Sequence, residues 1–235
     1  PDAKTVYMFE LNREQNDCRL VSYDATTGDR LAELYRETSD KYVEPLHPIK
    51  FLPWDATKFV MQSQRDGYNH LYIYNIKGEC IRQLTSGPWV VMDVLGFNTK
   101  QKSIVIKSNE RGYQQSNIFS VKTANGCRTC LNPDNGVVQQ AKLSASGQRL
   151  YVKYSEPTVP RRIICTSTYH PSPIILLDAE DPWKDYQQPI YENGTLKAAD
   201  GITDLYWRMV KPADFDPQKK YPTVVYVYGG PHAHN

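Results

Sequence analysis

The sequence predicts a mainly β chain, in which a partial β-propeller of about three and a half four-stranded blades precedes the first strands of an α/β domain. Three observations lead to this prediction. Short runs of β-branched and aromatic residues alternate with turn residues, in a chain that contains 17 Tyr, 16 Pro and 13 Gly. One sequence pattern returns after 45 residues, a spacing typical of propeller blades. The end of the chain departs from this pattern with a hydrophobic run that stops at a Gly-rich turn.

The repeat is clearest in a turn and in the strands beside it. The residues QRDGY at 64–68 are echoed by ERGY at 110–113, with the Gly and the Tyr of the two copies 45 residues apart. A weaker copy follows, because IVIKSNE at 104–110 resembles LYVKYSE at 150–156 at an offset of 46. In such strands every second side chain can face a neighbouring blade. The strands expected for three full blades are 49–54, 59–64, 69–76 and 80–85; 90–97, 103–109, 116–122 and 127–131; and 138–144, 149–154, 161–166 and 174–178.

Ahead of the full blades we expect a blade without its first strand, with strands at 6–11, 18–24 and 31–36. Its last two strands are joined by a turn at Thr26-Thr27-Gly28-Asp29. Closed propellers usually need 4–8 blades, so a closed ring is not expected within this chain. The open faces at its two ends should be adhesive or covered by another copy. Arg65, Asp66 and Arg111 recur at one place in two blades, which favours a structural role in the turn over a binding role.

Composition and charge exclude several classes of protein. With 235 residues and 40% hydrophobic content, the chain can bury a core but is too short for two large domains. Its 28 Lys and Arg nearly balance 26 Asp and Glu, so no basic field attracts nucleic acid. No apolar run approaches the ~20 residues that span a bilayer. The chain starts at Pro1 without a charged-then-apolar leader, so we expect an internal piece of a longer protein with no signal peptide in this stretch.

The last stretch of the chain bears most directly on function. Thr223–Tyr228 lacks polar alternation, which predicts a parallel strand buried on both faces, and Gly229-Gly230-Pro231 then ends it. A bare Gly-Gly-Pro would be an ordinary chain turn. Here the Gly-Gly-Pro turn follows three short motifs in a fixed order: Lys211-Pro212, Asp214-Phe215-Asp216 and Lys220-Tyr221-Pro222. From Asp204 onward this series resembles the start of the catalytic α/β-hydrolase domain of the prolyl oligopeptidase family of serine peptidases, most closely its dipeptidyl peptidase IV branch.

The resemblance implies an organisation and an activity for the parent protein. Residues 1–185 would be part of an N-terminal β-propeller, and residues 186–235 a connector and the first strands of an α/β-hydrolase domain. The parent would be a serine exopeptidase that releases Xaa-Pro or Xaa-Ala dipeptides from peptide substrates through an acyl-enzyme. The resemblance further implies a homodimer without a cofactor, in a periplasmic, secreted or cell-surface setting.

The resemblance also implies roles for individual residues. In the family, the tyrosine before the Gly-rich turn donates a hydrogen bond to the developing oxyanion, and Tyr228 matches it. A phenol stays protonated at working pH, so it can stabilise charge that arises only in the transition state. The family's propeller lends an aromatic residue followed by Arg to the substrate cavity. Val43 and Glu44 occupy the corresponding place and are the candidate substrate-binding residues, although they depart from that pattern.

Acyl transfer needs groups that this stretch does not contain. It requires a Ser on a Gly-x-Ser-x-Gly turn, followed by Asp and His, and no such turn occurs in the 235 residues. The pair of adjacent glutamates that holds the substrate's ammonium group in the dipeptidyl peptidase branch is also absent. We therefore expect this chain alone to be inactive. The alternative hypothesis is a non-catalytic β-propeller that binds peptide or protein.

Among five cysteines, Cys127 and Cys130 form the one close pair. A redox couple, half of a zinc site and a structural disulfide are the three interpretations. The absence of a second Cys or His pair argues against zinc, and the position of the pair between a strand-like run at 118–121 and a loop at 132–136 favours the disulfide. Relatives carry a disulfide at the corresponding place, which agrees with an extracytoplasmic setting. No metal site is expected, since His232 and His234 would need ligands that the sequence does not place. Asn193-Gly194-Thr195 matches the glycosylation acceptor pattern.

Overall fold

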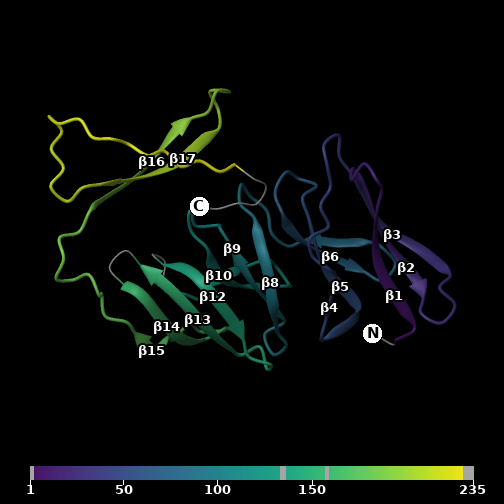
Figure 1. Cartoon of the computed structure of the whole chain (residues 1–235). Coiled ribbons are helices and arrows are strands. Elements are labelled where there is room, and N and C mark those ends of the chain that lie inside the picture. Colours follow the sequence, from purple (N-terminus) through teal and green to yellow (C-terminus); the bar gives the residue numbers. More distant parts are fainter. Residues whose placement is uncertain (1–2, 133–135, 157–158, 230–235) are drawn as a thin grey trace. The chain divides into compact units, whose positions relative to one another are not determined.

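The structure is a computed structural model that describes residues 3–132, 136–156 and 159–229 (Figure 1). Throughout these residues every regular element is a β-strand, which confirms the predicted mainly β class. None of them forms a helix that could cross a membrane. The chain divides into two compact units, Pro1–Glu180 and Asp181–Asn235. The first unit contains β1 to β15, and the second contains β16 and β17.

The first unit consists of four antiparallel sheets, which we call blades 1 to 4 in chain order. Blade 1 has three strands, and blades 2, 3 and 4 have four strands each. Consecutive strands are hydrogen-bonded neighbours in every blade, so the prediction of one incomplete and three full blades is confirmed. The strands are β1 (Thr5–Leu11), β2 (Asp17–Asp24) and β3 (Arg30–Thr38); β4 (Lys50–Leu52), β5 (Asp55–Ser63), β6 (His70–Asn75) and β7 (Cys80–Gln83); β8 (Val91–Asn98), β9 (Ser103–Ser108), β10 (Asn117–Lys122) and β11 (Arg128–Cys130); and β12 (Val137–Leu143), β13 (Arg149–Glu156), β14 (Val159–Ser167) and β15 (Ile174–Asp178).

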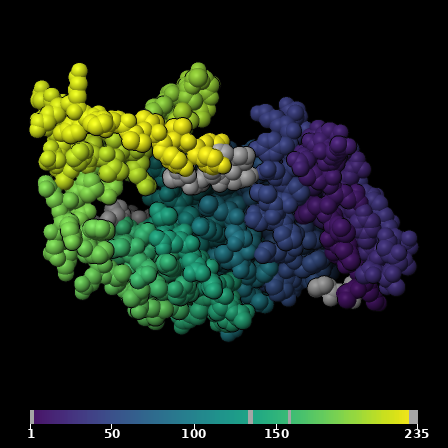
Figure 2. All heavy atoms as spheres, in the orientation of Figure 1, coloured from purple at the N-terminus to yellow at the C-terminus, as the bar shows by residue number. Residues whose placement is uncertain are grey.

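Three apolar clusters hold the blades together, one between each pair of successive blades. Figure 2 shows the atoms of these blades in contact in chain order, from purple to green. In β5, Phe59 and Met61 belong to the cluster shared with blade 1, whereas Val60 belongs to the cluster shared with blade 3. In β9, Ile104 faces blade 2 and Val105 faces blade 4. None of these five side chains is more than 2% exposed, so strand alternation gives each central strand two buried faces.

Two turn glycines let successive blades approach closely near their outer strands. Gly78 lies in the turn between β6 and β7 with φ +86°, and Gly126 lies in the equivalent turn of blade 3 with φ +74°. A Cβ on Gly78 would lie 2.5 Å from the carbonyl oxygen of Leu34 in blade 1. A Cβ on Gly126 would lie 2.6 Å from the carbonyl oxygen of Leu84, which follows β7. Both positions therefore require glycine for backbone conformation and for space.

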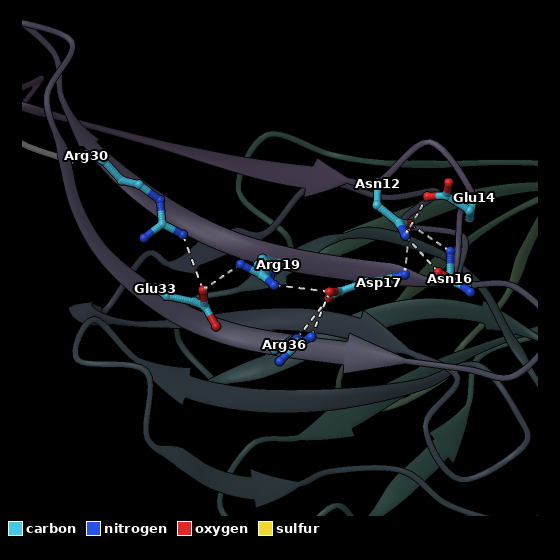
Figure 3. Close-up of polar contacts among 8 residues, drawn as sticks. All are labelled: Asn12, Glu14, Asn16, Asp17, Arg19, Arg30, Glu33 and Arg36. Carbon is cyan, nitrogen blue, oxygen red and sulfur yellow. Dashed lines mark hydrogen bonds and ion pairs between the residues drawn. The ribbon is translucent and has the colours of Figure 1, made fainter.

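Blade 1 carries a network of ion pairs along β2 and β3 (Figure 3). Asp17 accepts hydrogen bonds from the Nε and Nη2 atoms of Arg36 at 2.9 and 2.8 Å, and from Arg19 at 3.1 Å. Glu33 lies 3.7 Å from Arg19 and 3.2 Å from Arg30, so charges alternate in sign along the network. The hydrogen bonds from Arg36 and Arg19 lower the pKa of Asp17 to about 2.

The second unit contains one antiparallel hairpin, β16 (Ile190–Lys197) and β17 (Asp204–Lys211). β16 runs through the glycosylation pattern at Asn193-Gly194-Thr195 and continues to Lys197. Gly194 does not interrupt it because the Trp207 ring covers that position: a Cβ on Gly194 would lie 2.4 Å from Cζ2 of Trp207. An ion pair of 2.6 Å between Lys211 and Glu192 also joins the two strands.

The prediction of a buried strand at Thr223–Tyr228 is wrong for this structure. Residues 222–229 form no regular element, and the side chains of Val224 and Val227 are 95% and 81% exposed. A strand needs a hydrogen-bonded neighbour, and among the described residues none pairs with this segment. The hydrophobic run alone predicts a strand, but its burial depends on residues distant in sequence. Gly230 and Pro231 lie outside the described residues.

The contact between blades 2 and 3 predicts a large difference between two isoleucine truncations. Ile104→Ala removes a fully buried side chain from that contact and is expected to lower the free energy of unfolding by about 2–5 kcal/mol. Ile81→Ala, on β7 at 50% exposure, is the matched control and should change it by less than about 0.5 kcal/mol. Urea denaturation followed by fluorescence measures both. Equal losses would contradict the inter-blade position of Ile104.

The ion-pair network predicts a contribution to acid sensitivity. The folded-state pKa of Asp17, about 2, lies below its ordinary value of 3.8, so the contribution is present above pH 4 and is lost as the pH falls through 2. Asp17→Asn should therefore lose less stability than the wild type between pH 5 and pH 2. Urea midpoints across this range measure the effect, which should be small because the pairs are exposed. Asp40→Asn, which changes an exposed carboxylate outside the network, should retain the wild-type pH dependence.

Candidate functional site

The loops of the first unit gather at two opposite edges of the blades. In an antiparallel meander, the loop between the second and third strands lies at the same edge as the segment that leads into the next blade. We call this the loop edge; it carries residues 12–16, 39–49, 64–69, 84–90 and 109–116. The opposite edge, called the turn edge, carries the remaining strand-to-strand turns. The candidate substrate-binding residues Val43 and Glu44 and both copies of the repeated turn lie at the loop edge.

A repeated backbone hydrogen bond ties the loop edge together. The amide of Val43, in the segment that leads from blade 1 to blade 2, donates to the carbonyl oxygen of Gln15 at 2.8 Å. The amide of Val91 donates to the carbonyl oxygen of Asn69 at 2.8 Å at the next contact. A third bond, from Val138 to Ser116 at 3.3 Å, joins blade 4 to blade 3. The same link thus joins the first strand of a blade, or the segment that leads into it, to the loop of the preceding blade.

The structure places the two candidate substrate-binding residues at this edge, in different environments. The Val43 side chain is only 7% exposed, so it packs inward. Glu44 is half-buried, and its carbonyl oxygen accepts a hydrogen bond from the Leu46 amide at 2.9 Å. Tyr42, which precedes them, is 56% exposed. Tyr42, Glu44 and Leu46, which is 55% exposed, are thus side chains of this segment that reach the surface at the loop edge.

Arg65 is held between aromatic rings from two blades. Its guanidinium carbon lies 4.5 Å from the ring centroid of Tyr35 in blade 1 and 4.1 Å from that of Tyr72 in blade 2. Its Nη1 donates to the Tyr74 hydroxyl at 2.6 Å, and its Nε donates to the Ser63 hydroxyl at 3.1 Å. A planar guanidinium can stack and donate at the same time, whereas an ammonium cannot. We call Arg65 and these four residues the arginine clamp.

A carboxylate completes the arginine clamp. The Ser63 hydroxyl donates to Glu37 Oε2 at 2.8 Å, and the Tyr35 hydroxyl also donates to this carboxylate. Burial, followed by this hydrogen bond to Glu37, raises the pKa of Tyr35. These phenol, hydroxyl and carboxylate groups are therefore engaged with one another across the contact between blades 1 and 2. The arrangement supports the predicted structural role of Arg65.

The second copy of the turn is also engaged in structural contacts. Glu110 accepts two hydrogen bonds from Arg128 Nε and one from its Nη2, at 2.6–2.9 Å. The Arg128 guanidinium carbon lies 5.2 Å from the Trp89 ring centroid. A cavity of about 480 Å³ adjoins this pair and is lined by Glu110, Arg111, Phe119, Arg128 and both Cys127 and Cys130, among others. Glu110 neutralises Arg128, and Arg111 supplies a second guanidinium group to the lining.

The predicted Cys127–Cys130 disulfide is absent from the structure. Cys130 ends β11, Cys127 precedes this strand, and the Cys130 thiol donates to the carbonyl oxygen of Asn132 at 3.3 Å. Three residues of extended chain span ~10 Å, whereas disulfide-bonded Cα atoms usually lie within ~7 Å. Formation of the bridge would therefore require β11 to leave its pairing with β10.

The histidines and the remaining candidate residues form no common site. His70 is buried, with Nε2 2.9 Å from the carbonyl oxygen of Gly87 and Nδ1 3.1 Å from the Thr85 hydroxyl. No cluster of three His, Cys, Asp or Glu residues could hold a metal ion among the described residues, and His232 and His234 lie outside them. Tyr228 belongs to the second unit and is 63% exposed.

Comparison with known proteins identifies the family. The profile described as "Dipeptidyl peptidase IV (DPP IV) N-terminal region" matches residues 1–161, more than half of the chain. The chain belongs to this family. It is 27% identical over 229 residues to "Dipeptidyl peptidase 4" of Trichophyton tonsurans, which covers 94% of this chain and 29% of that protein. The predicted dipeptidyl peptidase IV resemblance and propeller fold are thereby confirmed.

Solved structures of dipeptidyl peptidase IV proteins contain the same fold. A Bacteroides ovatus protein described as a dipeptidyl aminopeptidase IV matches all of this chain with a TM-score of 0.90 and 44% identity, over 36% of its own length. Porphyromonas gingivalis dipeptidyl peptidase 4 matches with a TM-score of 0.81 and 24% identity, over 31% of its length. The chain therefore spans about a third of the length of these relatives.

The arginine clamp predicts that lysine cannot replace Arg65. Arg65→Lys keeps the positive charge but removes the planar guanidinium that stacks on the tyrosine rings. We therefore expect the free energy of unfolding to fall by about 1–2 kcal/mol. Arg13→Lys, in the exposed turn between β1 and β2, is the matched control, with an expected change below about 0.5 kcal/mol. Urea denaturation measures both. If the two variants were equally stable, the stacking geometry of Arg65 would not contribute to stability.

Proposed function

We propose that this chain is part of a serine exopeptidase that releases N-terminal dipeptides with Pro or Ala in the second position. The observation that carries the proposal is the match of the chain to dipeptidyl peptidase IV proteins along 94% or more of its length, in sequence and in fold. The match includes the second unit, which carries the punctuated motifs at 211–222. In this proposal residues 186–235 begin an α/β-hydrolase domain, and the complete protein is a homodimer located outside the cytoplasm.

Tyr228 has the proposed catalytic role within this chain. Its phenol would donate a hydrogen bond to the oxyanion that forms when the nucleophile attacks the peptide carbonyl, and this charge is present only in the transition state. Tyr228 lies in an exposed segment of the second unit, where its side chain is accessible. Because the sequence contains no Gly-x-Ser-x-Gly turn, the nucleophile is assigned to another part of the complete protein.

A non-catalytic propeller that binds peptide or protein is the second candidate function. It is favoured by one observation, the lack of a nucleophile turn in the 235 residues. The two functions differ in a direct assay. The complete protein should hydrolyse a Gly-Pro chromogenic substrate and react with a fluorophosphonate probe if it is a serine exopeptidase, and should do neither if it only binds. The 235-residue chain alone should be inert in both assays.

The role of Tyr228 predicts a specific kinetic effect in the complete protein. Tyr228→Phe removes one oxyanion donor, so we expect kcat for a Gly-Pro substrate to fall ~100- to 1000-fold, with little change in KM. Tyr226→Phe, two residues earlier and 76% exposed, is the matched control and should retain nearly full kcat. Steady-state kinetics of the two variants provide the measurement. A Tyr228→Phe variant with wild-type kcat would exclude this residue as the donor.

A further inference from the structure

A second cavity lies at the turn edge, away from the residues considered for peptide binding. Its volume is about 250 Å³, and it is lined by residues of blade 3 and by the segment Thr168–Pro171, which follows β14 of blade 4. Most of the lining is polar, with hydroxyl, amide, ammonium and imidazole groups, and no Asp or Glu takes part. The side chains used below are those of Ser103, Ser120, Lys122, Thr129 and His170.

Strand register brings the blade 3 residues together. Ser103 and Lys122 are directly paired between β9 and β10, and Ser120 and Thr129 are paired between β10 and β11. Within β9, Ser103 lies two residues from Val105, a member of the apolar cluster shared with blade 4. Since side chains two residues apart share a face, the polar groups extend that apolar contact toward the turn edge. The cavity is therefore the polar end of the contact between blades 3 and 4.

The floor of the cavity contains two buried hydroxyl groups, one of which has an O–H that is not used in their mutual hydrogen bond. Ser103 is 1% exposed and Ser120 is 7% exposed, and their Oγ atoms are 3.0 Å apart. Two hydroxyls have two hydrogens, and their mutual hydrogen bond uses one of them. Among the described residues no other acceptor is found for the second hydrogen. One O–H group at the floor is thus available to a ligand that accepts hydrogen bonds.

The blade 4 wall is fixed by its own hydrogen bonds. The Thr168 hydroxyl accepts from Asn98 Nδ2 at 2.8 Å and donates to the carbonyl oxygen of Gly147 at 2.7 Å. Both Asn98 and Thr168 are 1% exposed, so this link is internal to the contact between blades 3 and 4. The His170 ring, two residues later, packs on Tyr169 with ring centroids 3.9 Å apart. The wall opposite Lys122 is therefore preformed.

The charge of the cavity is positive. Lys122 provides an ammonium group at its exposed rim, and within the described residues no Asp or Glu lies within ion-pair distance of it. His170 provides an imidazole, whose ring can donate a hydrogen bond. Donors and positive charge without a competing carboxylate favour a ligand whose atoms are hydrogen-bond acceptors with negative charge.

We propose that this cavity binds a small oxyanion, either a phosphate or a carboxylate group. Lys122 supplies the charge, and the Ser103–Ser120 pair supplies a preorganised donor at the floor. Thr129 and His170 supply further donors at the rim. The cavity has room for the anion and its remaining hydration, and it lies at the opposite edge of the blades from Glu44. Binding there would be independent of the proposed peptidase activity.

Titration of the 235-residue chain with inorganic phosphate, and separately with succinate, tests this proposal by isothermal calorimetry and by two-dimensional NMR. We expect saturable binding of at least one anion at a single site, with the largest amide shifts at Ser103, Ser120 and Lys122. A response to phosphate alone or to succinate alone identifies the source of the oxyanion. If neither anion produced saturable shifts at these residues up to 50 mM, the proposal would be overturned.

Variants distinguish specific anion binding in this cavity from non-specific attraction of anions to the protein surface. Lys122→Gln should weaken binding at least tenfold, and Ser120→Ala about threefold, whereas Lys122→Arg should retain most of the affinity. Lys77→Gln is the matched control, because Lys77 is exposed in the turn of blade 2 that precedes β7. If Lys77→Gln and Lys122→Gln weakened anion binding equally, the loss would be due to the net charge of the protein, and the proposed site would be refuted. Thermal melting of each variant confirms that any loss of binding is not a loss of folding.

Discussion

The structure of the first unit depends on a single constraint, the alternation of side chains along strands whose two faces are both covered. A central strand such as β5 contributes Phe59 to one blade contact and Val60 to the next. Its blade therefore cannot bury its apolar surface alone, and each blade is stabilised by the blades beside it. The backbone links at the loop edge, such as Val91 to Asn69, fix the spacing that this packing requires.

This constraint assigns different roles to different parts of each blade. Most central strand positions are apolar, so polar side chains concentrate toward the ends of the strands and in the turns. At the loop edge, Arg65 and Glu110 occupy equivalent turns, and both are engaged in holding strands or blades together. The accessible side chains there come both from connecting segments, as with Tyr42, and from the turns, as with Tyr68. At the turn edge, the contact between blades 3 and 4 ends in hydroxyl groups and in Lys122, which gives that edge its donor character.

Local sequence signals predict most of the fold because they specify strands and turns directly. The strand β15 begins and ends where the sequence places it, and the other blade strands agree to within a few residues. Non-local contacts account for the differences. Trp207 covers Gly194 and allows β16 to continue. Thr223–Tyr228 forms no regular element and is exposed, since no strand among the described residues pairs with it. The arginine clamp combines residues of three strands and the turn after β5, so no short sequence motif predicts it.

Native-state hydrogen exchange tests the central claim, that mutual burial between blades stabilises the first unit. We expect the amides of β5, β6, β9 and β10 to exchange slowest and with similar free energies, since these strands share buried faces. The amides of β16 and β17, whose hairpin has exposed side chains on both faces, should exchange much faster. Protection of β16 and β17 equal to that of β9, or independent exchange of blades 2 and 3, would contradict it.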